Sequence, residues 1–204
     1  MGEDFEKNIH ILTKKALKGD IDSAKIVIEF LSGTGLKQAE AVAYLIVYQI
    51  VMNNFIDLGE ECRQCGGICC RFGEPIQLYD FDLDDLRNAG IDIDRYVIRR
   101  GSSVYLPRPC PFQKGWRCTI HFVKPYACLS YPFAVEDIQK DVIERYVSGV
   151  PEPFISGFCR AGQKAWSIIK MLIDDFRRIY NKDPSALELL DYAIQKLKKM
   201  QNNK

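Results

Sequence analysis

The chain has 204 residues, of which 47% are hydrophobic and 27% charged, and its formal net charge is +1. This size and composition are those of an ordinary folded domain and exclude a low-complexity or disordered chain. The near-neutral charge gives no broad basic surface for nucleic acid or anionic lipid. We therefore expect neither a nucleic acid nor a membrane as a partner, and a protein partner would be recognised at a local site.

Residues 1–58 are predicted to be helical. Gly19 and Asp20 interrupt the first helical pattern, and Asp20 supplies an N-cap for a second helix that runs to Leu31. A turn at residues 32–35 precedes a third helix, over residues 36–58. The first helix is indicated by apolar residues at helical spacing, namely Phe5, Ile9, Leu12 and Ala16.

The third predicted helix contains an apolar run from Ala41 to Met52. Gln49 interrupts this run, and Asn53 and Asp57 follow before the roughly 20 apolar residues of a membrane span accumulate. We therefore expect a buried core helix. Gly33-Thr34-Gly35 joins two helices without a preceding strand, so no nucleotide-binding loop is predicted there.

Residues 59–159 hold all the cysteines and have the character of short strands and loops. Residues 96–98 and 104–106 are predicted strands. One short helix is expected through Leu86, capped by Asp80 or Asp82 and ended by Gly90.

Residues 160–204 are predicted to form two helices. The second has Asp183 as its expected N-cap and Pro184 as its first helical residue. The whole is predicted to be one domain over residues 1–204, with a mostly helical α+β fold. In this fold the N- and C-terminal helices frame an irregular, cysteine-rich, metal-binding middle with short strands. The first of the two helices is marked by an apolar stripe, made by Trp166, Ile169, Ile173, Phe176 and Tyr180.

The N-terminal sequence is acidic and lacks the features of a secretory signal, so we expect a cytoplasmic protein. Cysteines stay reduced in such a compartment, and eight of them indicate metal binding or redox chemistry rather than structural disulfides. We predict that all eight are metal ligands: Cys62, Cys65, Cys69, Cys70, Cys110, Cys118, Cys128 and Cys159.

The run Cys62-x-x-Cys65-Gly66-Gly67-x-Cys69-Cys70 is the sharpest motif. A two-residue gap lets Cys62 and Cys65 face one metal, and the glycines permit a tight turn. Adjacent cysteines tend to diverge, so Cys69 and Cys70 are expected to serve different roles or different metal centres. Burial as small apolar residues is an alternative for any single cysteine, but it does not explain this run. A thioredoxin-like redox pair would need a strand-to-helix context that the run lacks.

This run, together with Cys110-Pro111-Phe112, Cys118-x-Ile120 and Lys124-Pro125-x-x-Cys128-x-x-Tyr131-Pro132-Phe133, resembles the YkgJ-type cysteine cluster family. The resemblance covers about residues 60–135. It implies a zinc- or iron-chelating domain whose CxxCxxCC signature is shared with flagellin lysine N-methylase. Catalytic residues are not identified by it, and a link to protein N-methylation rests on the resemblance alone.

Zinc, iron and an iron–sulfur cluster all suit the cysteines, and an iron–sulfur cluster is favoured. Zinc sites are usually built from two close cysteine or histidine pairs, and only Cys62 and Cys65 form one. Widely spaced cysteines, with Cys110 followed by proline, are typical of iron–sulfur ligation. His121 is an alternative ligand, and four cations near the cysteines could offset thiolate charge: Arg63, Arg71, Arg117 and Lys124.

Two functions remain open at this stage. In one, the metal site acts in electron transfer or protein modification. In the other, a structural zinc module takes part in protein–protein interaction. Eight thiolates allow two four-ligand sites or one site with spare residues.

Overall fold

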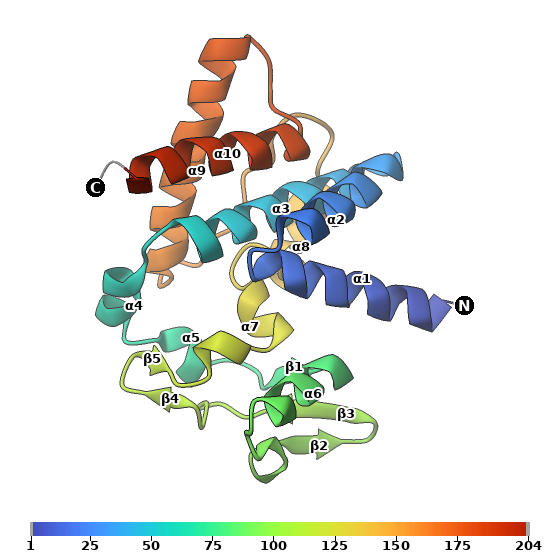
Figure 1. Ribbon diagram of the computed structural model, residues 1–204, viewed down its shortest axis with the longest axis vertical. Helices are drawn as coiled ribbons and strands as arrows, with labels where there is room; N and C mark the ends of the chain where they lie inside the picture. The colour runs from blue at the N-terminus through green and yellow to red at the C-terminus, as the bar shows by residue number, and fades with distance from the viewer. Residues whose placement is uncertain (1, 203–204) are drawn as a thin grey trace.

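The computed structural model describes residues 2–202, and side chains are described for residues 7–200. Three helices come first, and two long helices end the chain (Figure 1). The first three are α1 (Gly2–Leu17), α2 (Ile21–Gly33) and α3 (Lys37–Phe55). The last two are α9 (Arg160–Tyr180) and α10 (Ala186–Asn202). The predicted mostly helical α+β fold, with terminal helices around a middle that contains strands, is confirmed.

The middle of the chain contains more helix than the sequence predicts. Its helices are α4 (Gly59–Cys65), α5 (Ile68–Arg71), α6 (Asp80–Asn88), α7 (Tyr126–Ser130) and α8 (Glu136–Glu144), with 3-10 turns η1 (Ile93–Arg95) and η2 (His121–Val123). Its strands are β1 (Ile76–Leu78), β2 (Ile98–Arg100), β3 (Ser103–Leu106), β4 (Gln113–Lys114) and β5 (Arg117–Cys118).

The strands form two small antiparallel sheets. β3 lies between β1 and β2, with Gln77 opposite Tyr105 and Arg99 opposite Val104. β4 and β5 make a separate hairpin, in which Gln113 lies opposite Cys118. The predicted strand at residues 104–106 is confirmed. The one predicted at 96–98 begins only at Ile98, because a 3-10 turn occupies residues 93–95.

The larger of two hydrophobic cores lies among the terminal helices. α3 is buried almost all round, as expected from its apolar run, and Tyr48 at its centre is fully buried. Tyr48 packs edge-on against Phe133 and contacts Trp166 of α9. In the described part of the chain no single helix is long and apolar enough to cross a membrane. Only α3 and α4 together pass such a test, and they meet at 99°.

The smaller core lies under the three-stranded sheet, in the lower half of Figure 1. It is built from Leu86 of α6, Ile93 and Leu106, with Ile120 at its margin. Three of the cysteines pack against this core, namely Cys110, Cys118 and Cys128.

Two buried polar contacts hold the segment around α7, and the first of them also joins the two cores. Lys14 of α1 pairs with Asp82 of α6 at 2.6 Å, and both side chains are almost completely buried. The same carboxylate accepts the Tyr126 backbone N–H at 2.9 Å. On the other side of α7, Gln49 of α3 accepts the Phe133 N–H at 2.9 Å. α7 is therefore held between the helical core and the sheet.

The N-cap predicted for α2 is confirmed, whereas those predicted for α6 are not. Asp20 caps α2 by accepting the Ser23 N–H at 2.7 Å, as predicted. Asp82 lies inside α6, where it accepts the Tyr79 N–H at 3.2 Å, so neither predicted aspartate is the N-cap residue.

The predicted cap of the last helix is wrong. Ser185 accepts the Glu188 N–H at 3.2 Å while Glu188 accepts the Ser185 N–H at 2.9 Å. This reciprocal pair satisfies two free amides, and Asp183 is instead engaged by Arg177 at 2.7 Å. The helix therefore begins at Ala186 rather than Pro184.

Candidate metal centre

The turn between α4 and α5 depends on two glycines, as the sequence predicts. Gly66 and Gly67 both have left-handed backbone conformations, with φ of 65° and 68°. The Gln113 side chain donates to the carbonyls of both, at 3.1 Å each. A Cβ at Gly67 would lie 2.4 Å from that amide nitrogen. The turn therefore lets the β4–β5 hairpin approach the first four cysteines.

Cys62 and Cys65 lie on α4, a helix with no buried residue. Polar contacts dock this helix on the start of α9. Lys164 pairs with Glu61 at 2.8 Å, and Arg160 donates to Gln64 at 2.7 Å. These contacts bring the first cysteine pair beside a helix that begins almost 100 residues later.

Cys159 is the N-cap residue of α9 and is buried. Its sulfur accepts the Gly162 N–H at 3.4 Å. A side chain at Gly162 would lie 2.9 Å from Pro132 and 3.2 Å from the Cys159 sulfur, so a glycine is needed for this close approach. Cys159 therefore stands at the N-terminus of the first of the two helices predicted over residues 160–204, immediately before that predicted range.

The remaining cysteines come from several short elements. Cys70 belongs to α5, and its carbonyl accepts the Cys110 N–H at 2.8 Å. Cys118 lies on β5, opposite Gln113, and the Gln113 N–H bonds the Cys110 carbonyl at 3.1 Å. Cys128 lies on α7. The sheet hairpin, α5 and α7 thus bring together cysteines that are far apart in the sequence.

The thiols influence one another electrostatically. Burial raises the pKa of Cys62 to about 11, with further contributions from Cys65, Cys69 and Cys159. Burial likewise raises the pKa of Cys128 to about 12, and Cys110 and Cys118 add to it. A thiolate here would be poorly solvated and close to other thiolates, so a bound cation is the species that would stabilise several of them together.

The adjacent thiols of Cys69 and Cys70 lie close together, and their predicted assignment to different roles or metal centres stays a prediction. Their thiols interact directly, and this hydrogen bond lowers the pKa of Cys69, as do the charges of Arg108 and Lys124. The same bond and burial raise the pKa of Cys70. The adjacent pair therefore lies between two groups of thiols. Cys69 is also close to Cys159, whereas Cys70 is also close to Cys110 and Cys128.

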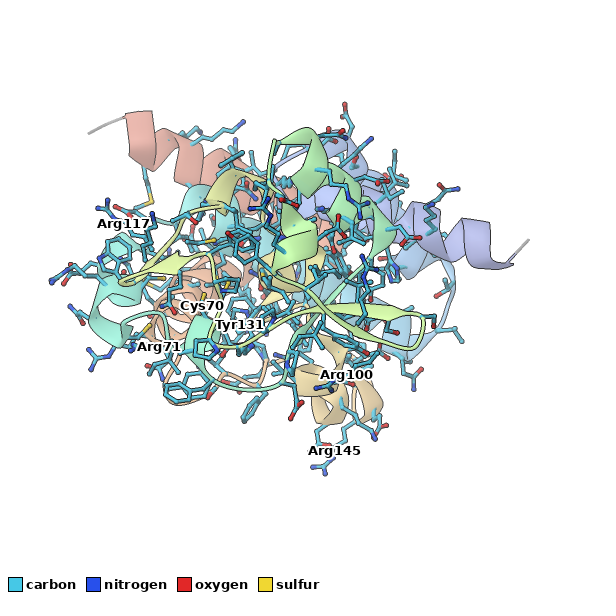
Figure 2. The ribbon with its side chains drawn as sticks, turned by 90° about the horizontal axis from the view of Figure 1, so that it is seen from below. Cys70, Arg71, Arg100, Arg117, Tyr131 and Arg145 are labelled. Carbon is cyan, nitrogen blue, oxygen red and sulfur yellow. The ribbon has the colours of Figure 1, made fainter. Side chains whose placement is uncertain are left out.

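Of the four predicted cations, Lys124 influences the thiols, lowering the pKa of Cys62, Cys69 and Cys128 against the effect of burial. Arg63 pairs with Glu60 at 2.6 Å, and Arg71 donates to the Gly66 carbonyl at 2.7 Å. Arg117 lies over the Trp116 ring, and Figure 2 shows it at the margin of the molecule, away from Cys70.

Two residues near the thiols were missed by the sequence analysis. Arg108 lowers the pKa of Cys69, Cys110 and Cys128, and donates to the Phe72 carbonyl at 2.6 Å. Tyr131 lies near Cys70 in Figure 2. Its hydroxyl is buried against the Cys159 thiol without a hydrogen bond of good geometry in the described structure. The signal for Arg108 was its position two residues before Cys110, whereas Tyr131 stands in the motif Cys128-x-x-Tyr131 that carries the family resemblance but was given no role there.

The donor set fits a thiophilic metal, although the side chains are not yet arranged around one. All eight cysteines are free. Within residues 7–200, no three His, Cys, Asp or Glu side chains are close enough to hold a metal ion as they stand. Cys65 donates to the Cys62 carbonyl at 3.4 Å, so its sulfur faces backbone. His121 is exposed, and desolvation followed by the charge of Lys124 lowers its pKa.

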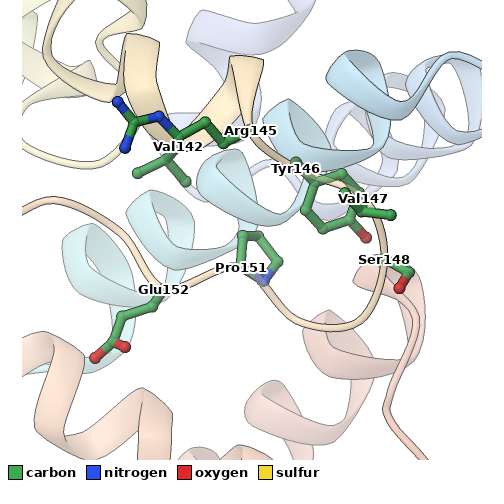
Figure 3. Close-up of a pocket in the computed structure, with 7 residues that line it drawn as sticks. All are labelled: Val142, Arg145, Tyr146, Val147, Ser148, Pro151 and Glu152. Carbon is green, nitrogen blue, oxygen red and sulfur yellow. The ribbon is translucent and has the colours of Figure 1, made fainter.

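A surface hollow elsewhere has no part in this site. It is lined by Val142, Arg145 and Tyr146 at the end of α8 and by Pro151 and Glu152 (Figure 3). No cysteine lines it. The cysteine-rich region is therefore the candidate functional site.

Comparison with known proteins supports this assignment. No curated protein and no solved structure matches the chain. Residues 61–147 match the family model CxxCxxCC, described as a putative zinc- or iron-chelating domain. That segment includes every cysteine except Cys159. Residues 61–147 are therefore similar to a putative zinc- or iron-chelating domain, which agrees with the family resemblance seen in the sequence.

Proposed function

We propose that the cysteine-rich region binds an iron–sulfur cluster and that the protein transfers electrons. The observation that carries this proposal is the composition of the donor set. Thiols from α4, α5, β5, α7 and the N-terminus of α9 lie close enough to influence one another. His121, by contrast, is exposed. Cysteine-only ligation is typical of iron–sulfur clusters.

The surroundings of the sulfurs would suit a bound cluster. Backbone N–H groups of Gly162 and Phe112 face the sulfurs of Cys159 and Cys110. Arg108 and Lys124 add positive charge. Hydrogen bonds to sulfur and nearby charge are the means by which proteins set the potential of a cluster.

A bound cluster supplies one-electron transfer. Every cysteine except Cys159 is only half-buried, so the site lies near the surface, where a redox partner can approach. Phe72 and Phe122, which lie close to cysteines in the sequence, are exposed, and this supports a protein partner. The eight free thiols further support the proposal that the protein functions in a reducing compartment such as the cytoplasm.

A structural zinc module is the second candidate. The observation in its favour is that α4 and α5 contain no buried residue. Elements without a core need another source of stability, and a zinc ion held by four thiolates would provide it.

Metal and sulfide analysis of anaerobically purified protein separates the two candidates. We expect iron and acid-labile sulfide, with a visible absorption that dithionite bleaches and air restores. Stoichiometric zinc without sulfide would overturn the iron–sulfur proposal in favour of the zinc module.

A further inference from the structure

The eight cysteines fall into two sets according to the elements that hold them. The first set lies where α4 and α5 meet the start of α9, and consists of Cys62, Cys65, Cys69 and Cys159. The second consists of Cys110, Cys118 and Cys128, which pack against the small core under the sheet, and of Cys70, whose carbonyl accepts the Cys110 N–H at 2.8 Å.

Thiols of the first set influence one another electrostatically although they are far apart in the sequence. Cys62 is influenced by Cys65, Cys69 and Cys159, and Cys159 is influenced by Cys69 and Cys65. Charges interact strongly only at short range, within about 10 Å at ordinary ionic strength. The polar contacts of Arg160 and Lys164 with α4 hold the same elements together.

Contacts within the second set are independent of α9. Cys110 is joined to Cys70 by a backbone hydrogen bond of 2.8 Å. Cys128 is influenced by Cys110 and Cys118, and Cys70 by Cys110 and Cys128. Cys110, Cys118 and Cys128 pack on the small core, whereas Cys62 packs on the large one.

The two sets meet at the adjacent pair Cys69 and Cys70. Cys69 is also close to Cys110, so the sets are neighbours rather than remote. Each set contains four thiols, which is the ligand number of a tetrahedral zinc site and of the common iron–sulfur clusters.

We propose that the cysteines form two separate four-thiolate metal sites, one from Cys62, Cys65, Cys69 and Cys159, and the other from Cys70, Cys110, Cys118 and Cys128. This rests on the proposed metal-binding function. Closing either site requires side-chain rotation, since no three ligands are preassembled among the described side chains. α4 and α5 bury no residue, so small shifts there meet little packing resistance.

One consequence concerns the terminal helices. Cys159 lies beyond the matched family segment, residues 61–147. The first site therefore includes a ligand from the helical framework, whereas the second is contained in the family segment. Loss of Cys159 should empty the first site and leave the second loaded.

The experiment is metal analysis of full-length variants after anaerobic reconstitution with ferrous iron and sulfide, or with zinc alone. The variants are Cys159→Ser, Cys118→Ser and the double variant. Ser156→Ala and Thr119→Ser are matched neighbouring controls. Helical circular dichroism, measured on every sample, shows whether the large helical core remains folded.

We expect Cys159→Ser and Cys118→Ser each to keep about half of the wild-type metal, the double variant to keep almost none, and both controls to keep all of it. Full loading of Cys159→Ser, or complete loss in either single variant with the helical signal intact, would overturn the two-site proposal. Halved zinc without sulfide would support two sites while overturning the iron–sulfur proposal. A wild-type protein that binds neither metal would overturn both.

Discussion

α3 buries most of its residues, whereas α4 and α5, which follow it directly, bury none. The terminal helices share a large apolar core, and this core needs no other source of stability at this chain length. The cysteine-bearing elements are short and rest on a small core, with few apolar contacts of their own. One chain thus combines a framework stabilised by apolar burial with a segment of short elements that bury few residues of their own.

Breaking a thiolate site should have the largest effect. Cys65→Ser is expected to lose the metal of the first site, about half of the total, and to expose α4 and α5 to proteases while the second site and the terminal helices persist. Ligand binding contributes directly to the folding of such a segment, by about 10 kcal/mol in small zinc domains. Limited proteolysis with mass spectrometry and metal analysis measure both effects. Arg63→Ala is the control, because Arg63 is exposed and pairs only with Glu60. Unchanged cleavage and unchanged metal in Cys65→Ser would contradict the comparison.

The next largest effect is expected at the junction between the two regions. Asp82→Asn removes the fully buried carboxylate that pairs with Lys14 and leaves the more exposed Asp85, at 2.7 Å, as its charged partner, so the protein should be destabilised by less than the roughly 3–5 kcal/mol of a fully broken buried pair. Urea unfolding measures this change in the free energy of unfolding. Asp84→Asn is the control on the same helix, because the Asp84 carboxylate is exposed and its pairing with Arg87, at 3.9 Å, is weak. Equal stabilities of the two variants would show that the buried pair does not join the regions.

A smaller effect is expected from the amide that connects α3 to the segment after α7. Gln49→Leu leaves the Phe133 N–H buried without an acceptor, at a cost of about 1–3 kcal/mol. The loss should appear as a lower urea midpoint. Gln163→Ala is the control, because it removes only an exposed bond to the Gly157 carbonyl. A midpoint no lower than that of the control would show that the hydrogen bond between Gln49 and Phe133 does not stabilise the fold.

The smallest effect concerns acid stability in the helical framework. Hydrogen bonds from Lys196, Tyr192 and Arg178 hold the pKa of Asp175 well below its usual 3.8. The group therefore stabilises the fold above that value, and the contribution is lost as the pH falls through the lower, folded-state pKa. The Tm of Asp175→Asn should fall less than the Tm of the wild type when the pH is lowered from neutral to strongly acidic. A steeper acid loss in the variant would reverse the sign of this argument, and Asp174→Asn serves as the exposed control.

The sequence predicted the parts of the fold that depend on local pattern. Burial of α3 follows from its apolar run, and the Asp20 cap follows from a polar residue after Gly19. α8 was not predicted because its stability is tertiary. Its buried Gln139 bonds Pro132 at 3.0 Å and both backbone groups of Phe154, at 2.8 and 2.9 Å. The sequence of this short, charged helix contains no local pattern from which these long-range contacts could be predicted.

The same distinction applies to the site. Cysteine spacing was sufficient to predict a shared thiol-rich region, since the residue type itself carries the chemistry. It could not show that Arg108 rather than Arg63 or Arg117 faces the thiols, because that depends on which way each loop turns. Nor could it divide the eight cysteines, since the docking of α9 on α4 is a long-range contact.

Hydrogen–deuterium exchange on metal-loaded and chelator-treated protein tests the difference between the two regions most directly. We expect metal removal to raise exchange strongly in residues 59–133 and at the start of α9, and to leave α3 and α10 protected. Equal exchange in both states across residues 59–133, in a sample shown to have lost its metal, would contradict a segment ordered by thiolate ligation.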